Sequence, residues 1–268
     1  MHKYHIPDSI LPVRFHFSRQ DIEKIARDEL RQVDCLPKSP AAIPLERYLS
    51  RRHQIEPRQT DRLPIGVLGA ADLADPSLPV IWIRQEVFDG PSNRYRSTLA
   101  HEIAHLVLHT SLYIDPEFSD TIARCNGGGK SLARGFQCGD EQIQDAPQRP
   151  TSNAHPLFHL EFQANLGMVA FLTPSPLVKA CVAEWTREEI LRGGERVFRL
   201  EESHRQEAIA RIAETFEVSR ELAGYRLGDL FPPASGPTFS PTANHRPAHK
   251  ASGSIGGEPS WKIQTTLW

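Results

Sequence analysis

The chain has 268 residues, of which 39% are hydrophobic and 24% charged, and its formal net charge is -2 at pH 7. This is the composition of an ordinary globular protein, without the basic excess of most proteins that bind nucleic acids directly. No stretch reaches the roughly 18 uninterrupted apolar residues of a membrane-spanning helix, and the first ten residues contain no apolar core of a signal peptide. The four cysteines are too few and too scattered for a disulfide scaffold. Together, these features lead us to expect a cytoplasmic protein without membrane association.

In chain order, the periodic segments predict helices, then a small sheet, then further helices. Helices are predicted over 18–30, 44–52, 94–109, 160–172, 188–216 and 219–230, and strands over 63–68 and 78–83. This order predicts an α+β fold. We expect an extension over 1–14, a main domain over 15–185 and a helical part over 186–231.

Two segments lack this periodicity. Residues 115–153 are rich in polar residues and glycine, which indicates an insertion within the main domain. Within it, Gly129-Lys130-Ser131 is similar to the end of a phosphate-binding loop, but Arg124 stands where such a loop requires glycine. We therefore interpret the segment as a flexible glycine loop. Residues 232–268 are rich in Pro, Ser, Gly and Thr and are predicted to form a disordered tail.

His101-Glu102-Ile103-Ala104-His105 is an H-E-x-x-H sequence within the predicted helix 94–109. Histidines four residues apart lie on one helix face, so His101 and His105 can bind the same metal ion. Glu102 is rotated from that face by about 100°, close enough to hold a water molecule there. The surrounding residues are apolar almost all round, which predicts a buried helix. Because burying these polar groups without a partner is costly, the segment indicates a metal site more strongly than a chance match.

A hydrolytic zinc site takes three protein ligands and leaves its fourth position to water. The metzincin pattern is excluded, because Leu108 and Ser111 stand where it requires glycine and histidine. His109 is too far along the helix axis to complete a tetrahedron with His101 and His105, since each turn rises about 5.4 Å. We interpret His109 as a helix-end residue that the helix dipole favours.

The predicted helix 160–172 offers a third ligand. Glu161 and Asn165 are four residues apart and share a face, so Glu161 can bind the metal while Asn165 bonds one of the other ligands. Alternatively, Glu161 is a first-turn glutamate that stabilises the helix N-terminus. His155 and His159 are rival third ligands, so the residues alone leave this position open.

These motifs resemble, in the same order, those of the ImmA/IrrE family of metallopeptidases. That family joins an A-H-E-x-x-H helix to an E-x-x-A-N helix, which ends at an apolar residue followed by proline. In this chain the first motif starts at Ala100 and the second at Glu161. The upstream LPIGVLGAADL and LPVIWI and the downstream FEVSRELAGYRLGDL extend the likeness over about residues 15–231. The connection between the two helices is longer than the family pattern, in agreement with an insertion.

The resemblance implies a zincin-like metallopeptidase fold, with a small sheet packed on the H-E-x-x-H helix and helices at the C-terminal end. It implies Zn²⁺ bound by His101, His105 and Glu161, with Glu102 as the general base. It also implies an endopeptidase that cleaves a helix-turn-helix (XRE-type) repressor or antitoxin and so relieves repression. We expect no direct contact of this chain with nucleic acid.

Two other functions also fit the residues. Residues 213–230 have the length of a helix-turn-helix, which would make the protein a DNA-binding regulator with a non-catalytic metal site. However, residues 187–229 carry eight arginines against ten acidic residues, so this segment is poorly suited to hold phosphates. A zinc-stabilised scaffold that binds a repressor without cutting it would have the same ligands.

Overall fold

The computed structural model describes residues 2–5, 13–73, 75–114, 136–139, 158–190 and 196–233. Residues 1–231 form one compact unit, and 232–268 form a second, of which only the first two residues are described. The predicted tail, the glycine loop at 127–131 and most of the predicted insertion therefore lie outside the described residues. In the described part, no helix is long and apolar enough to cross a membrane.

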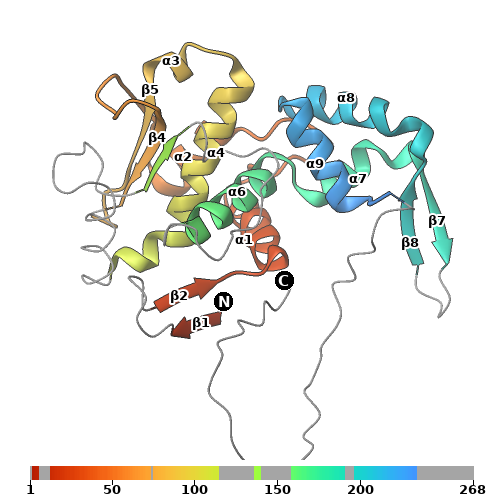
Figure 1. Cartoon of the computed structure of the whole chain (residues 1–268), viewed down its shortest axis with the longest axis horizontal. Helices are drawn as coiled ribbons and strands as arrows, with labels where there is room; N and C mark the ends of the chain where they lie inside the picture. The colour runs from red at the N-terminus through yellow and green to blue at the C-terminus, as the bar shows by residue number, and fades with distance from the viewer. Residues whose placement is uncertain are drawn as a thin grey trace, which may run out of the picture. The chain divides into compact units, whose positions relative to one another are not determined.

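The N-terminal part of the main unit contains three α-helices, the strands of two sheets and the H-E-x-x-H helix (Figure 1). In chain order its elements are β1 (His2–His5), β2 (Val13–His16), α1 (Arg19–Gln32), α2 (Leu45–His53), β3 (Arg58–Thr60), β4 (Val67–Asp72), β5 (Val80–Arg84), α3 (Gln85–Phe88), α4 (Ser92–His109) and the 3₁₀ helix η1 (Thr110–Ile114). Helix α1 starts where its sequence predicts, because Ser18 and Asp21 form a capping box at its N-terminus.

The main sheet has the strand order β3-β5-β4-β6, and β6 (Phe136–Gly139) comes from the predicted insertion. Strand β3 is parallel to β5, whereas β4 is antiparallel to both β5 and β6. The sequence predicts a strand over 63–68, but the structure places it at Val67–Asp72. The backbone carbonyls of Leu63 and Val67 instead accept hydrogen bonds from the Arg84 guanidinium. These bonds hold the segment before β4 as a loop.

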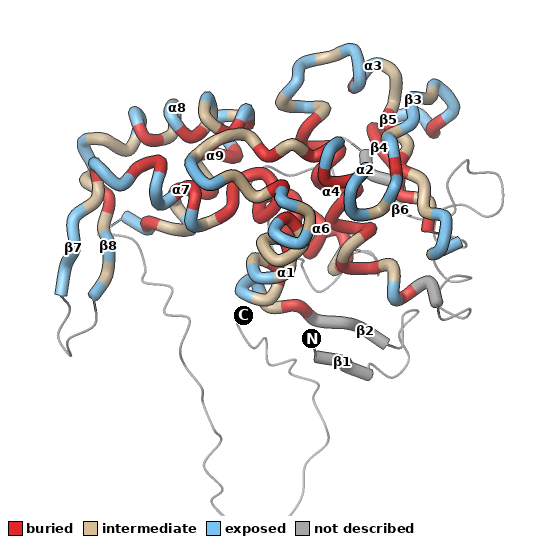
Figure 2. The backbone as a smooth tube through the Cα atoms, turned by 180° about the vertical axis from the view of Figure 1, so that it is seen from behind, coloured by how far each residue is buried: buried red, intermediate tan, exposed pale blue. Residues whose placement is uncertain are grey.

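The two longest apolar helices form the centre of the core. Helix α6 (Phe158–Leu172) packs against α4 on one side and against α1 on another, and the sheet packs on α4. Figure 2 shows that buried residues are concentrated along α4 and α6. This arrangement confirms the predicted α+β class, with helices covering a small sheet.

The C-terminal part differs from its prediction in one segment. Its elements are α7 (Ser175–Cys181), η2 (Ala183–Trp185), β7 (Thr186–Ile190), β8 (Arg196–Leu200), η3 (Glu202–His204), α8 (Arg205–Phe216) and α9 (Arg220–Leu230). The helix predicted over 188–216 is therefore wrong at its start, where β7 and β8 form an antiparallel pair. Ion pairs join diagonal neighbours on the two strands, as in Glu188 with Arg196, and such cross-strand contacts favour strands.

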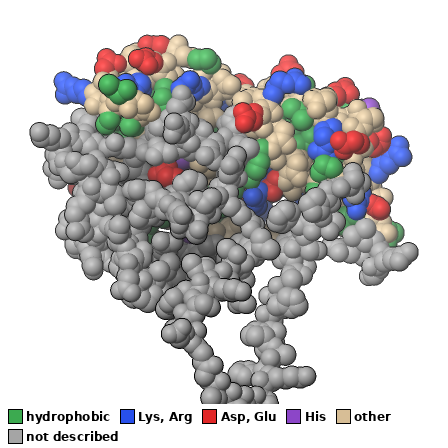
Figure 3. Space-filling model, in the orientation of Figure 1, with side chains coloured by type: hydrophobic (Ala, Val, Ile, Leu, Met, Phe, Trp, Pro, Cys, Tyr) green, Lys and Arg blue, Asp and Glu red, His purple; other side chains and the backbone are tan. Residues whose placement is uncertain are grey.

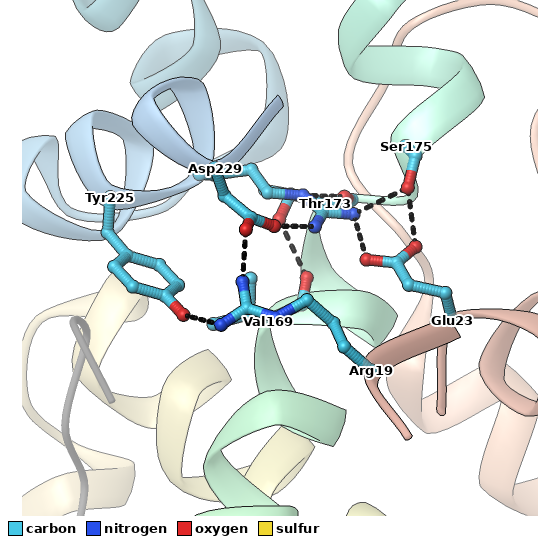
Figure 4. A network of polar contacts seen from close by, with 8 residues as sticks. Arg19, Glu23, Val169, Thr173, Ser175, Tyr225 and Asp229 are labelled. Atoms are coloured by element: carbon cyan, nitrogen blue, oxygen red, sulfur yellow. Dashed lines mark hydrogen bonds and ion pairs between the residues drawn. The ribbon is translucent and has the colours of Figure 1, made fainter. Parts of the chain in front are cut away.

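A buried polar network connects α9 to α1 and to the end of α6 (Figure 4). The Arg226 side chain is almost fully buried, and its Nε donates a hydrogen bond to the Thr173 carbonyl at 2.9 Å. Its Nη2 donates to Ser175 Oγ at 2.9 Å and lies 2.5 Å from Glu23 Oε1. Asp229 adds a second carboxylate 3.3 Å from Nη1. A single buried cation thus joins three parts of the chain that are far apart in sequence.

Candidate metal centre

Helix α4 carries both histidines of the H-E-x-x-H sequence, and α6 brings Glu161 against them. One ligand atom from each of His101, His105 and Glu161 lies within 4.8 Å of the other two. Oε2 of Glu161 is 3.1 Å from Nε2 of His101 and 3.4 Å from Nε2 of His105. All three side chains are buried. Two imidazole nitrogens and one carboxylate oxygen that converge in this way form a donor set typical of catalytic zinc.

Glycine at position 167 allows the two helices to approach closely. A Cβ atom placed on Gly167 would lie only 2.6 Å from the Cβ atom of Ala104. Ala104 lies between the two histidines in sequence, and Gly167 is six residues after Glu161, so the tight contact belongs to the same helix pair as the ligands. The small residues at this crossing therefore set the distance over which Glu161 reaches the histidines.

Asn165 fixes the orientation of the His101 ring. Its Oδ1 lies 3.1 Å from Nδ1 of His101. Because an amide oxygen only accepts hydrogen bonds, Nδ1 of His101 must donate, and the lone pair of the neutral ring is then on Nε2. That nitrogen is the one that faces Glu161. The contact between Asn165 and a histidine ligand is the arrangement that the spacing of α6 predicts.

His109 has a corresponding role for His105, and the sequence interpretation of His109 as a helix-end residue missed it. His109 is fully buried, with Nδ1 3.0 Å from Nδ1 of His105 and Nε2 3.2 Å from Oε1 of Gln163. Burial holds the His109 pKa well below its usual value, so the ring is neutral. Because Nε2 of His109 donates to Gln163, Nδ1 of His109 accepts a hydrogen bond from Nδ1 of His105. The lone pair of His105 is then on its Nε2 atom, which faces His101 and Glu161.

The rival third ligands have other positions. The Nε2 atom of His159 lies 2.9 Å from Nε2 of Gln163, and His159 is not part of the convergent group. His155 lies outside the described residues. Glu161 is the residue of α6 that meets both histidines. Although burial raises it, the interactions with the His105 and His101 rings lower the Glu161 pKa overall, so this carboxyl is ionised.

Glu102 is fully buried next to this group and points toward the sheet. Neither of its carboxylate oxygens has a hydrogen-bond partner of ordinary geometry among the described residues. Burial raises the Glu102 pKa well above its usual value, and the negative charge of Glu161 is the second, smaller cause. The nearby backbone of Ala71 acts in the opposite direction. A Cβ on Gly69 of β4 would lie 2.9 Å from Oε1, so the side chain fits against the strand only because residue 69 is glycine.

These features test whether the residues fit a metal ion. A buried carboxylate without partners costs about 1–3 kcal/mol or more, because its lost hydration is not replaced. Three donor atoms nearby can hold a cation, and a water molecule carried by that cation would supply the missing partner of Glu102. The donor set and the unsatisfied carboxylate therefore both fit a hydrated metal ion.

The chain matches no model of a known protein family and no curated protein. The chemistry assigned to the site therefore depends on the geometry of its side chains. Two histidines and a glutamate converge from two helices and can hold a metal ion, and a second glutamate without a hydrogen-bond partner in the described part of the chain lies beside them. This combination is suited to hydrolysis.

Proposed function

We propose that the protein is a zinc-dependent endopeptidase with a zincin-like fold. The observation that carries this proposal is the position of Glu102, a buried carboxyl that has no hydrogen-bond partner among the described residues and lies beside the group of His101, His105 and Glu161. A purely structural metal site has four protein ligands and needs no such residue. The resemblance to ImmA/IrrE metallopeptidases assigns the same four residues to the same roles.

His101 and His105 would bind the metal through their Nε2 atoms, and Glu161 through Oε2. A bound zinc ion supplies Lewis-acid chemistry, which lowers the pKa of water and polarises a peptide carbonyl. Glu102 would then accept a proton from water at its carboxylate and deliver it to the leaving amine. The apolar surroundings help Glu102 to hold this proton between the two transfers, since burial favours its neutral form.

The substrate that we propose is a helix-turn-helix (XRE-type) repressor or antitoxin, whose cleavage would relieve repression. This part of the proposal is supported by the family resemblance. It also agrees with the surface in Figure 3, where Lys and Arg side chains alternate with Asp and Glu among the described residues of that face. Such a surface is poorly suited to a direct contact with nucleic acid.

Glu102→Gln tests the proposal. The variant keeps the ligands, so we expect about one zinc per chain after dialysis. Hydrolysis should fall about 10²- to 10⁴-fold, because the general base is lost. Metal content is measured by elemental analysis, and cleavage is measured on small helix-turn-helix proteins encoded by neighbouring genes. Glu86→Gln, at an exposed glutamate of α3, is the matched control and should cleave at the wild-type rate.

Substitution of the third ligand completes this experiment. Glu161→Ala should abolish stoichiometric zinc binding, whereas His159→Ala, one turn away from the group, should retain it. Undiminished cleavage by Glu102→Gln would contradict the peptidase assignment. Undiminished zinc content in Glu161→Ala would contradict the ligand assignment alone.

A further inference from the structure

Strand β6 occupies one edge of β4, beside the candidate metal centre. Strand β4 pairs with β5 along one edge and with β6 along the other, and β6 also contacts helix α4 (Figures 1 and 2). In chain order, β6 comes between α4 and α6, from the segment that the sequence identifies as an insertion. On that interpretation, the strand is an addition to the sheet of β3, β5 and β4.

The register places β6 opposite the part of β4 that lies against Glu102. Cys138 pairs with Gly69, and Gln137 pairs with Ala70. Gly69 is the residue whose added Cβ would meet Oε1 of Glu102. Neighbouring strands lie about 4.8 Å apart, so the backbone of β6 passes one strand spacing from the residue that adjoins the proposed general base. The ladder is irregular between Val67 and Gly69, and such bulges are common next to active sites.

An extended peptide binds to a sheet by adding a strand to an open edge, through main-chain hydrogen bonds. For Glu102 to act on a peptide bond, the peptide must pass beside the part of β4 at Gly69. A peptide on the outer edge of β6 would lie about two strand spacings from Gly69, whereas a peptide paired with β4 would lie one spacing away, so we take the β4 edge that β6 fills as the one that serves Glu102. An external peptide strand and β6 therefore compete for the same backbone N–H and C=O groups of β4.

We propose that β6 is an internal occupant of the substrate-binding edge, and that it must leave β4 before an extended substrate segment can bind antiparallel to the same strand. This inference deepens the proposed function, since it takes the β4 edge as the side on which the peptidase receives its substrate. The partner is an extended segment that lacks strand partners of its own. The protein in its described state is then autoinhibited.

The size of β6 fits a removable strand. It has four residues and lies at the end of the strand order, so it pairs with one strand only. As part of the same chain, β6 is present at β4 at an effective concentration on the order of millimolar, so it would exclude a weakly binding peptide in trans. Its removal should reveal binding that the intact protein does not show.

The test measures binding, not cleavage, so its result does not depend on the peptidase assignment. All proteins are full-length and zinc-loaded, and they carry Glu102→Gln to prevent turnover. The probe is a fluorescent peptide with the sequence of residues 133–142, with serine in place of the cysteine. Gln137→Pro with Cys138→Pro removes two successive N–H groups, of which one must point to β4, since successive residues alternate. Gln137→Ala with Cys138→Ala, the matched control, changes the same side chains and keeps both N–H groups.

The proline pair should bind the peptide at least about tenfold more tightly than the alanine pair, as measured by fluorescence anisotropy, because β6 no longer competes. Equal affinities of the two variants would overturn the inference. Loss of the folded state in the proline pair alone, seen by circular dichroism, would overturn it as well, because a strand that the fold requires cannot leave. Failure of the proposed function would be seen separately, as hydrolysis that does not depend on Glu102.

Discussion

Among the single residues of the site, His109 is one that the sequence does not identify. Its two ring nitrogens connect His105 to Gln163, and these contacts leave the lone pair of His105 on the nitrogen that faces Glu161. The spacing of four residues from His105 predicts that His109 lies on the same face. It does not reveal the acceptor, because Gln163 comes from another helix.

His109→Ala should lower the affinity for zinc about 10- to 100-fold, because His105 loses the group that fixes its ring and tautomer. The dissociation constant is measured by competition with a chelator. His204→Ala, which changes a partly exposed histidine of η3, is the control and should bind zinc as the wild type does. An unchanged dissociation constant for His109→Ala would show that His105 is oriented without it.

The same histidines make the stability of the metal-free protein depend on pH. Burial holds the His109 pKa well below its usual value, so this ring stays neutral when folded, whereas the unfolded chain protonates it below about pH 6.5. Burial raises the Glu102 pKa, so this residue holds a proton that the unfolded chain releases above about pH 4.5. Between these pH values the unfolded chain binds one more proton at His109 and one fewer at Glu102, and the lowered pKa of His105 adds a contribution of the same sign as that of His109.

Through His109 alone, acidification from pH 6.5 toward 4.5 should lower the free energy of unfolding by about 1.4 kcal/mol per pH unit. Other groups add their own slopes, so the comparison with a variant is decisive. In His109→Asn the slope should be smaller by about the same amount, since the His109 proton no longer contributes. Urea unfolding of both metal-free proteins across this range measures the difference. Parallel curves would contradict a neutral, buried His109.

At the scale of elements, the contact between α4 and α6 sets the geometry of the site. Gly167→Ala should destabilise the protein by about 1–3 kcal/mol, because the added methyl group meets Ala104 at a distance that forces the helices apart. The same change should weaken zinc binding, since Glu161 moves with α6. The measurements are urea unfolding and chelator competition.

Gly228 in α9 provides the control for this substitution. A Cβ at Gly228 would meet nothing within 4 Å, so Gly228→Ala should stabilise the protein by about 0.5–1 kcal/mol through helix propensity alone. Opposite signs for the two alanine substitutions would show that the cost at residue 167 comes from the contact between helices. A stabilising Gly167→Ala would contradict the close packing.

The sequence predicts the long elements well and the short strands poorly. Helix α4 and helix α6 have strong apolar patterns, and the cap at Ser18 defines the start of α1. Strand β4 was misplaced because its centre, from Gly69 to Ala71, has low strand propensity and is held by burial against α4. Strands β7 and β8 were assigned to a helix because their stabilising pairs form across the two strands, which periodicity along the chain does not show.

The metal centre could be predicted further than the sheet could. The H-E-x-x-H spacing depends only on the geometry of one helix, so it holds for any helix that contains it. The approach of Glu161 and Asn165 depends on how two helices cross, which the sequence alone does not determine. For that reason the residues alone leave His155 and His159 as rivals of Glu161, and the position of α6 removes His159 from the group.

In the main unit as a whole, Arg226 connects α9 to α1 and α7, with Glu23 and Asp229 as its charged partners. Arg226→Met should destabilise the protein by about 3–5 kcal/mol, because two carboxylates lose their buried partner. Arg211→Met removes an exposed ion pair with Glu184 and should cost no more than about 1 kcal/mol. Thermal or urea unfolding compares the two, and similar losses would contradict the central position of Arg226.

The same part of the molecule bears on the DNA-binding alternative. Helices α8 and α9 are joined by a three-residue turn, as in a helix-turn-helix. However, α9 directs Tyr225 and Asp229 to Arg19 of α1, so this face of the second helix is already engaged within the protein. A helix that reads DNA must present such a face to the major groove. These contacts therefore argue against the use of this face of α9 as a recognition surface for DNA.

The long connection between the two ligand-bearing helices has a consequence for how such a protein can evolve. His101 and Glu161 meet although they are 60 residues apart in the chain. The entropy of closing a loop grows only with the logarithm of its length, so doubling this connection would cost about 0.6 kcal/mol. New segments can therefore be acquired between α4 and α6 without loss of the metal centre. Lineages that share this pair of helices can then diverge in what controls them while the chemistry stays the same.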